Sequence, residues 1–336
     1  MDSERINKLL KKTYNEVKSV KDGKNADYIP ELAKVNPNIF GISIMDCSGN
    51  LFNIGDHKTT VAIESISKLF SAAKVASDKG FDTLLKKIGV NGSFLPFNSI
   101  LATELAPDHT INPFLNQGAM ATTSILYKPN KKAYFDVILN NLSDYANRRL
   151  TVSNKIYKSE SENNERNMAL AYLLKSYKRF YGPVPDCVDI YTKQCSVEVS
   201  SDDLANMASV FANNGIHPKS KKKLLSCSDS RELTRMLKSG GLYQFSGLWA
   251  TRTGVASKSG VGGGILIIVP GICGIGLVSP PLDKIGNSVK GIKAGTKIVK
   301  EITNPDSCLI IKHKSRKNKS RKHKSRKKKS RKNNSR

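Results

Sequence analysis

The chain has 336 residues, 39% of them hydrophobic, which is enough to bury the core of one large domain or two smaller ones. Its formal net charge of +27 would suit a nucleic-acid-binding protein, but the excess is local. Residues 312–336 contain 15 Lys and Arg and no acid, leaving +12 for the rest, so charge does not define the folded part.

The sequence also does not fit a membrane protein, a secreted protein, or a protein held together by disulfides or a metal. The most apolar stretch, 265–278, is interrupted by Pro270 and Gly271, which excludes a membrane span and predicts two buried strands. The N-terminus lacks an apolar signal region, so we expect a cytoplasmic protein. Its six cysteines have no close pairs and no metal-ligand spacing, so we expect free thiols and no bound metal.

In chain order, a helical pattern at 3–20 precedes two apolar runs at 39–56, which flank a turn-rich DCSGN and predict a hairpin. Helical patterns follow at 65–79, 167–181 and 201–213, the last with a cap at Ser201-Asp202-Asp203. A second hairpin at 264–279 and a helix at 288–301 complete the pattern. The fold class is therefore α/β (α+β): an antiparallel sheet built from both chain ends, with flanking helices and an inserted all-helical lobe.

The last segment is a five-residue basic repeat (KSRKN, KSRKH, KSRKK, KSRKN) that starts at Lys314. It has no apolar residue with which to build a core, so we expect 311–336 to be disordered. We predict an N-terminal helical extension at 1–25 and a catalytic domain at 26–310. The tail could contact polyanions without sequence preference, act as a nuclear-import signal, or only aid solubility.

The candidate chemistry is a serine activated by a lysine. No histidine stands in a context that favours a Ser-His-Asp triad, and no phosphate-binding loop is present. In Ser65-Ile66-Ser67-Lys68 the two reactive side chains share one helix face, and a buried lysine loses its proton more readily. The same S-x-x-K spacing recurs at 71–74, 220–223 and 325–328, so the motif alone is weak. Ser65 stands out because it follows the first hairpin and opens a helical run.

A second motif supports this serine. Lys258-Ser259-Gly260 directly precedes the apolar run at 265, and a Lys-Ser/Thr-Gly edge strand usually accompanies S-x-x-K in penicillin-recognising serine enzymes. A glycine there permits close backbone approach, and the next N–H can help to form an oxyanion hole. Alone, the segment also fits an ordinary turn between strands.

Longer stretches resemble the glutaminases that share the serine β-lactamase fold. The matches run in order from residue 28 to residue 291, nearly the whole body. They include YIPELA at 28–33, SISK at 65–68, NPFLNQGA at 112–119, SESENNERN at 159–167, YTKQCS at 191–196 and YQFSGLWATRTGVASKSGVGGG at 243–264. The resemblance implies an enzyme that hydrolyses L-glutamine to L-glutamate and ammonia, needs no metal or organic cofactor, and forms a dimer or tetramer.

The resemblance also implies catalytic roles. Ser65 matches the nucleophile and Lys68 its base. Tyr28 matches a tyrosine near the nucleophile, and Tyr243 one that helps to relay the proton. Val261 matches the residue whose N–H completes the oxyanion hole.

Four further residues match those that hold the substrate amino acid, together with Ser65, Tyr243 and Val261. They are Asn116, Glu160, Asn167 and Tyr191. A carboxylate suits an α-ammonium group, whereas amide and hydroxyl donors suit an α-carboxylate. Without the resemblance, each would also fit a turn, a cap, a core aromatic or a solvated charge.

Three departures from the family pattern bear on the site. The stretch between Glu160 and Asn167 lacks the family's glycine, which could reshape that loop. Glu64 stands before the nucleophile where glutamine is usual, so a carboxylate there could pair with Lys68 or repel the substrate. Gln117 replaces a usual alanine. Two rival functions stay open: an amidohydrolase of this fold with another substrate, such as a β-lactam or a peptide, and an inactive enzyme body with a polyanion-binding tail.

Overall fold

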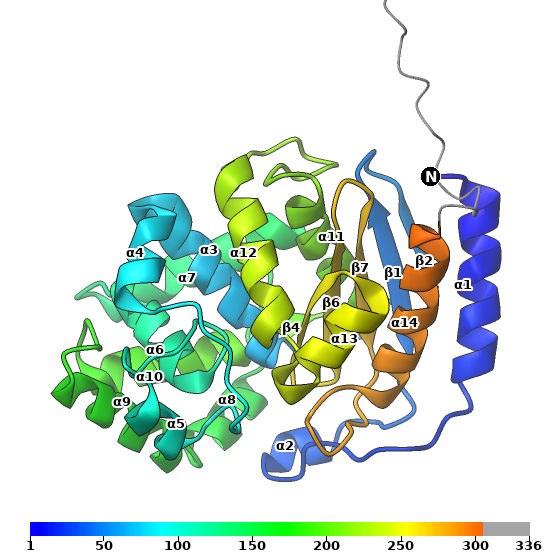
Figure 1. Cartoon of the computed structure of the whole chain (residues 1–336). Coiled ribbons are helices and arrows are strands. Elements are labelled where there is room, and N and C mark those ends of the chain that lie inside the picture. Colours follow the sequence, from blue (N-terminus) through cyan, green and yellow to red (C-terminus); the bar gives the residue numbers. More distant parts are fainter. Residues whose placement is uncertain (305–336) are drawn as a thin grey trace, which may run out of the picture.

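A five-stranded antiparallel sheet forms the centre of one layer of the molecule in the computed structural model, which describes residues 1–304 (Figure 1). Its strands are β1 (Gly41–Asp46), β2 (Leu51–Gly55), β5 (Ala256–Ser259), β6 (Gly264–Val269) and β7 (Cys273–Val278). They stand in the order β2-β1-β7-β6-β5, so the two expected hairpins meet where β1 pairs with β7. The sheet built from both chain ends is confirmed, whereas the expectations for the basic tail fall outside the described residues.

Both faces of this sheet are buried. On β6, Ile265, Ile267 and Val269 belong to one hydrophobic core, and Leu266 and Ile268 belong to another. Successive side chains of a strand point to opposite faces, so a continuously apolar strand must be covered on both sides.

Helices from the two chain ends cover one face. They are α1 (Ser3–Val17), α13 (Ser246–Thr253) and α14 (Val289–Thr303). Ile6 and Leu10 of α1 share their core with Ile298 of α14 and with the apolar side chains of the sheet. The helix expected as an N-terminal extension therefore packs as part of the sheet layer.

Helix α11 (Ser201–Ala212) covers the opposite face and lies unusually close to β7. A Cβ atom at Gly276 would come within 2.1 Å of the carbonyl oxygen of Ser201, and one at Gly274 within 2.2 Å of a backbone nitrogen of the helix. Only glycine permits this approach, so the two glycines fix the distance between helix and sheet.

The chain between the hairpins builds the expected helical lobe beside the sheet (Figure 1). Its helices are α3 (Ser67–Lys79), α4 (Phe81–Lys87), α5 (Ile100–Leu105), α6 (Asn116–Ile125), α7 (Lys131–Ala146), α8 (Asn154–Ser161), α9 (Glu165–Ser176), α10 (Val184–Cys195) and α12 (Cys227–Gly240). Shorter elements are α2 (Pro30–Ala33), the 3₁₀ helices η1 (Glu64–Ile66) and η2 (Tyr243–Phe245), and the strands β3 (Val61–Ala62) and β4 (Glu198–Val199), which pair with each other. Among the described residues no helix combines the length and apolar character that crossing a bilayer requires.

The cap of α11 and the start of α3 differ from the sequence prediction. The α11 helix is capped by Ser200, which accepts a hydrogen bond from the N–H of Asp203 in a reciprocal capping box, so the predicted cap lay one residue too late. Ser65 lies in η1, and α3 begins only at Ser67. The nucleophile candidate therefore sits in a tight 3₁₀ turn directly before the helix.

Candidate active site

The turn that carries Ser65 is strained. Glu64, directly before it, has a φ of +50°, a left-handed conformation that a residue with a Cβ rarely adopts. Tyr243, at the start of η2, also has a positive φ, +56°. Strained backbone is retained where the surroundings enforce it, commonly at active sites.

Lys68 lies one turn further along, and its side chain is completely buried. Its Nζ donates to Oδ1 of Asn116 at 2.7 Å and to the carbonyl oxygen of Phe114 at 3.3 Å. Burial lowers the pKa of Lys68 to about 8, although the neighbouring Cys195 and Glu64 act in the opposite direction. Among the described residues no hydrogen bond joins Lys68 Nζ to the Ser65 hydroxyl.

The Lys258-Ser259-Gly260 motif lies at the end of β5, which is an edge strand as expected. A Cβ atom at Gly260 would stand 2.5 Å from the carbonyl oxygen of Ile63 and 3.1 Å from the Cβ of Glu64. The glycine therefore permits close approach to the nucleophile turn, and Val261 follows it into the cavity.

A second buried lysine, Lys258, lies next to the same region of the chain. Lys258 Nζ donates to the carbonyl oxygen of Ser259 at 2.8 Å and lies 4.7 Å from the ring centroid of Tyr243. Burial, followed by the charge of Lys68, holds the pKa of Lys258 well below its usual range. Burial raises the pKa of Tyr243 to about 12, and the nearby Ser65 hydroxyl acts against this rise.

A cavity of about 500 Å³ opens beside the turn that carries Ser65. Of the predicted site residues, Tyr28, Ser65, Asn116, Glu160, Asn167, Tyr191 and Val261 line it. Nδ2 of Asn116 donates to Oδ1 of Asn167 at 3.0 Å, so Asn116 links Lys68 to Asn167. Lys68 and Tyr243 are buried behind this lining rather than exposed in it.

Several residues of the lining were not predicted from the sequence. They are Ile29, Glu64, Phe97, Asn98, Asn163, Arg166 and Cys195, of which Glu64 alone departs from the family pattern beside the candidate nucleophile. The ring of Phe97 lies 5.0 Å from that of Tyr243, and Lys68 Nζ lies 5.8 Å from its centroid. The Nε of Arg166 donates to the carbonyl oxygen of Asn98 at 3.0 Å. Arg166 falls inside the matching stretch 159–167, but nothing in the pattern marked it as a residue facing the cavity.

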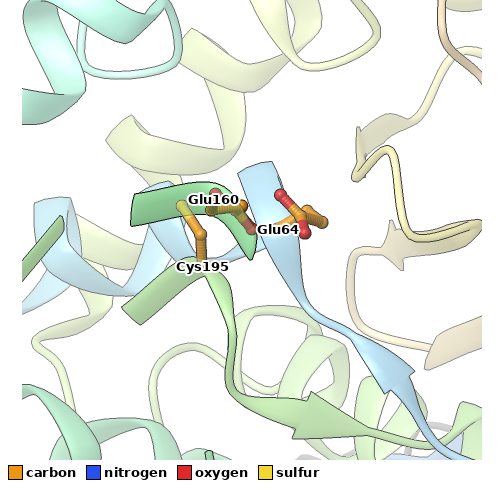
Figure 2. A group of neighbouring side chains, drawn as sticks. All are labelled: Glu64, Glu160 and Cys195. Carbon is orange, nitrogen blue, oxygen red and sulfur yellow. The ribbon is translucent and has the colours of Figure 1, made fainter. Parts of the chain in front are cut away.

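Glu64, Glu160 and Cys195 converge inside the cavity from three elements (Figure 2). One side-chain oxygen or sulfur of each lies within 4.8 Å of those of the other two. Such a group could supply ligands to a metal ion, although acidic clusters of this kind are common without one. The expectation that the chain uses no metal and no organic cofactor stays a prediction.

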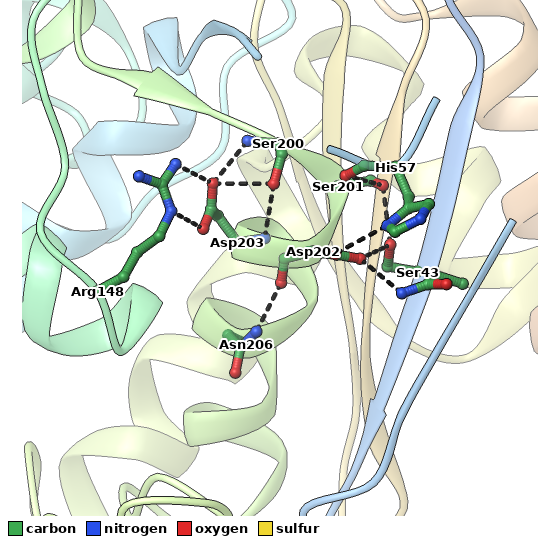
Figure 3. A network of polar contacts seen from close by, with 9 residues as sticks. Ser43, His57, Arg148, Ser200, Ser201, Asp202, Asp203 and Asn206 are labelled. Carbon is green, nitrogen blue, oxygen red and sulfur yellow. Dashed lines mark hydrogen bonds and ion pairs between the residues drawn. The ribbon is translucent and has the colours of Figure 1, made fainter. Parts of the chain in front are cut away.

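The histidines form no Ser-His-Asp triad among the described residues. Nδ1 of His57 lies 2.8 Å from Oδ2 of Asp202, but the hydroxyl of Ser43 donates to the same carboxylate rather than to the imidazole (Figure 3). This network fixes the start of α11 against β1. His217 is fully buried, and its Nδ1 accepts hydrogen bonds from two backbone N–H groups of its own loop.

Comparison with known proteins decides the family. The family model described as Glutaminase matches residues 23–304. The chain belongs to the glutaminase family. A glutaminase of Colwellia psychrerythraea is 45% identical over 289 residues, which cover 86% of this chain and 93% of that protein. Glutaminase 1 of Shigella flexneri is 36% identical over 90% of this chain and 97% of that protein.

Solved structures agree with this assignment. A probable glutaminase, ybaS, superposes with a TM-score of 0.88 at 36% identity, over 90% of this chain and 98% of that one. A probable glutaminase from Bacillus subtilis, in complex with 6-diazo-5-oxo-L-norleucine, gives a TM-score of 0.78 at 26% identity over 89% of this chain and 95% of that one. The expected glutaminase, which hydrolyses L-glutamine to L-glutamate and ammonia, and the expected β-lactamase-like fold are both confirmed.

Proposed function

We propose that Ser65 is the nucleophile of this glutaminase and that Lys68 is its general base. The observation that carries this assignment is the buried amine of Lys68, whose pKa falls to about 8 one turn after the strained turn of Ser65. A neutral amine has two N–H donors and one lone pair. Asn116 and the Phe114 carbonyl accept both donors, which leaves the lone pair to take the Ser65 proton.

In the proposed reaction the Ser65 oxygen attacks the side-chain amide carbon of glutamine. The N–H groups of Ser65 and Val261 stabilise the oxyanion, because Gly260 brings the end of β5 against the nucleophile turn. Tyr243 and Tyr28 relay the proton to the departing ammonia. Water then hydrolyses the γ-glutamyl ester of Ser65 and releases L-glutamate.

The substrate-holding roles follow from donor and acceptor chemistry. Glu160 is the acidic residue assigned to the α-ammonium group, and Asn167 and Tyr191 supply neutral donors for the α-carboxylate. Asn116 has a further part, since its side chain contacts both Lys68 and Asn167. It couples the position of the base to that of the bound amino acid.

A substrate panel tests this assignment against other amidohydrolases of the fold. The purified chain should release ammonia from L-glutamine at a rate at least about 100-fold above that from L-asparagine, since a misplaced amide carbon is not attacked. It should leave a chromogenic β-lactam intact. Preferred turnover of the β-lactam would overturn the substrate assignment.

The base assignment predicts a pH dependence. Lys68 acts only when unprotonated, so kcat should fall as the pH drops through about 8, by up to about tenfold per pH unit. Stopped-time ammonia assays between pH 6 and pH 9 measure this fall in kcat. A kcat that rises as the pH falls across this range would contradict the role of Lys68.

We further propose a homo-oligomer, dimer or tetramer, as the working form, and nonspecific polyanion contact by the basic segment 312–336. Sedimentation velocity would measure the first. For the second, heparin retention of the chain with and without that segment would be compared with its glutaminase activity. Loss of retention with full activity would separate the two functions.

A further inference from the structure

Two carboxyl groups meet inside the cavity, Glu64 from η1 and Glu160 from α8 (Figure 2). Glu64 is 4% exposed, and Oε1 of each carboxyl group is buried without a hydrogen-bond partner among the described residues. Two ionised carboxylates so close and so buried would repel each other and lose their hydration. The arrangement therefore needs a compensating positive charge or a proton.

No described side chain supplies that charge through an ion pair with either carboxylate. The nearest cation is Lys68, but its Nζ is bound to Asn116 and to a backbone carbonyl oxygen. Arg166 lines the same cavity and donates its Nε to a carbonyl oxygen. The other titratable groups around the pair are Tyr28, Tyr191, Cys195 and Tyr243, and the pKa of each lies above its usual range, so they stay neutral.

Burial is the main reason why the pKa of Glu64 lies well above its usual range, and the charge of Glu160 and a hydrogen bond with it act in the same direction. Burial also raises the pKa of Glu160. Of two such carboxyl groups, one loses its proton first and the charge left behind holds the other proton in place.

We propose that Glu64 and Glu160 share one proton in the empty site, and that the α-ammonium group of the bound amino acid displaces this proton into solvent. The inference rests on the proposed function, in which Glu160 receives that ammonium group. A bound cation favours the ionised form of a neighbouring carboxyl group, and its N–H donors can satisfy the unpartnered oxygens. The proton leaves as the cation arrives, so the charge of the pocket stays balanced.

Glu64 is then a positioning and specificity residue for substrates with a free α-ammonium group. It does not touch the reacting amide. Because one proton is exchanged for one ligand, affinity should weaken as the pH falls through the range in which the pair takes up its proton, by at most about tenfold per pH unit. The affinity of the enzyme for substrates without the ammonium group should not rise with pH.

Calorimetric titration of L-glutamine into Ser65→Ala protein tests the exchange without turnover. Titrations at pH 7 in phosphate and in imidazole, two buffers of different ionisation enthalpy, give the number of protons released; EDTA removes stray metal. We expect release of about 0.5 to 1 proton per bound glutamine. Adding Glu64→Gln, which keeps the shape but leaves Glu160 as the one titrating carboxyl group of the pair, should reduce the release, although burial still raises the pKa of Glu160.

The matched control is Glu162→Gln in the same background. Glu162 ends α8, its side chain is 63% exposed, and it pairs only loosely with Lys158 at 3.9 Å. Its proton release should equal that of Ser65→Ala alone, and circular dichroism should confirm that every variant is folded.

Two outcomes would overturn the inference. The first is binding of glutamine by Ser65→Ala protein with no proton release; this result alone decides, even where Glu64→Gln fails to fold. The second is equal release with Glu64 and with Gln at this position. Either result in an enzyme that hydrolyses glutamine leaves the proposed function intact, whereas a chain that neither binds nor hydrolyses glutamine would overturn both.

Discussion

Glu64 combines two unfavourable states, a left-handed backbone and a buried carboxyl group. The backbone strain follows from the turn that presents Ser65 to the cavity. The carboxyl group is costly only when it is ionised, so its effect on folding must depend on pH.

This cost predicts how stability changes with pH. The folded chain binds a proton at Glu64 that the unfolded chain has lost, so the free energy of unfolding should fall as the pH rises from the unfolded pKa, about 4.3, through the raised folded pKa. Each unit of that rise corresponds to about 1.4 kcal/mol. Glu64→Gln should therefore be more stable than wild type at pH 8 and gain less at pH 5.

Urea unfolding of both proteins at the two pH values measures the difference. Glu162→Gln serves as the exposed control and should follow wild type. An equal gain in the free energy of unfolding for Glu64→Gln at pH 5 and at pH 8 would contradict the prediction. It would mean that Glu64 in the folded chain does not change its charge between these two pH values.

A substitution at Gln117, the residue after Asn116, should raise the stability of the folded chain. Its side chain is completely buried in α6, and neither Oε1 nor Nε2 has a hydrogen-bond partner among the described residues. An unsatisfied buried polar group costs about 1–3 kcal/mol, so Gln117→Met, which nearly conserves volume, should raise the free energy of unfolding by about 1–2 kcal/mol.

Gln194 is the matched control, since it is equally buried but fully bonded. It accepts hydrogen bonds from Ser71 and Thr123 and donates one to Ser67. Gln194→Met should therefore lower stability in the same urea titration. A loss of similar size at both positions would contradict the account of Gln117.

Candidate reactive residues could be named from the sequence because chemistry restricts their types. Ser65 and Lys68 stand in a short motif that suits a nucleophile and a base, and the resemblance to glutaminases adds Glu160 as an ammonium ligand; these roles stay predictions. Phe97 and Arg166 face the same cavity, but an aromatic and a cation in loops or on helices have many ordinary uses. Their roles depend on how the chain folds over the site, which local sequence does not encode.

Among the elements, the two hairpins were predicted well and the helix starts less well. Apolar runs around a turn leave few alternatives to paired strands, and β6 and β7 satisfy that pattern. The start of α11 at Ser201 was predicted, but its cap was placed one residue late because 200–203 reads Ser-Ser-Asp-Asp, all capping types. The 3₁₀ turn at Ser65 was missed because tertiary contacts with the end of β5 create it.

The contact between β5 and η1 gives a prediction at this scale. Gly260→Ala would place a methyl group 2.5 Å from the Ile63 carbonyl oxygen, so the end of β5 must move and carry the Val261 N–H away from the oxyanion. Loss of one oxyanion donor lowers kcat by about 10²–10³-fold, and we expect a loss of this order.

Gly247→Ala is the control. Gly247 lies in the exposed helix α13, with nothing within 4 Å of an added Cβ atom. Activity should be unchanged and stability should rise slightly, by about 0.5–1 kcal/mol. A Gly260→Ala enzyme with wild-type kcat would show that this glycine does not set the oxyanion geometry.

At the scale of the whole molecule, the sheet joins the two ends of the chain and the helical lobe is inserted between them. The cavity takes Ser65 from the junction, Asn116 and Glu160 from the lobe, and Val261 from the end of the sheet. Sequence order predicted this arrangement, because strands at both ends must pair across whatever lies between. It did not predict that α1 would complete the sheet core, since one amphipathic helix can pack in many places.

The central claim is that this cavity breaks the amide bond of glutamine through Ser65. Ammonia release from L-glutamine by wild type and by Ser65→Ala protein, each verified as folded by circular dichroism, tests it most directly. We expect Ser65→Ala to lose at least about 10³-fold in kcat with an unchanged spectrum. Turnover by Ser65→Ala within about tenfold of wild type would contradict the assignment of the nucleophile.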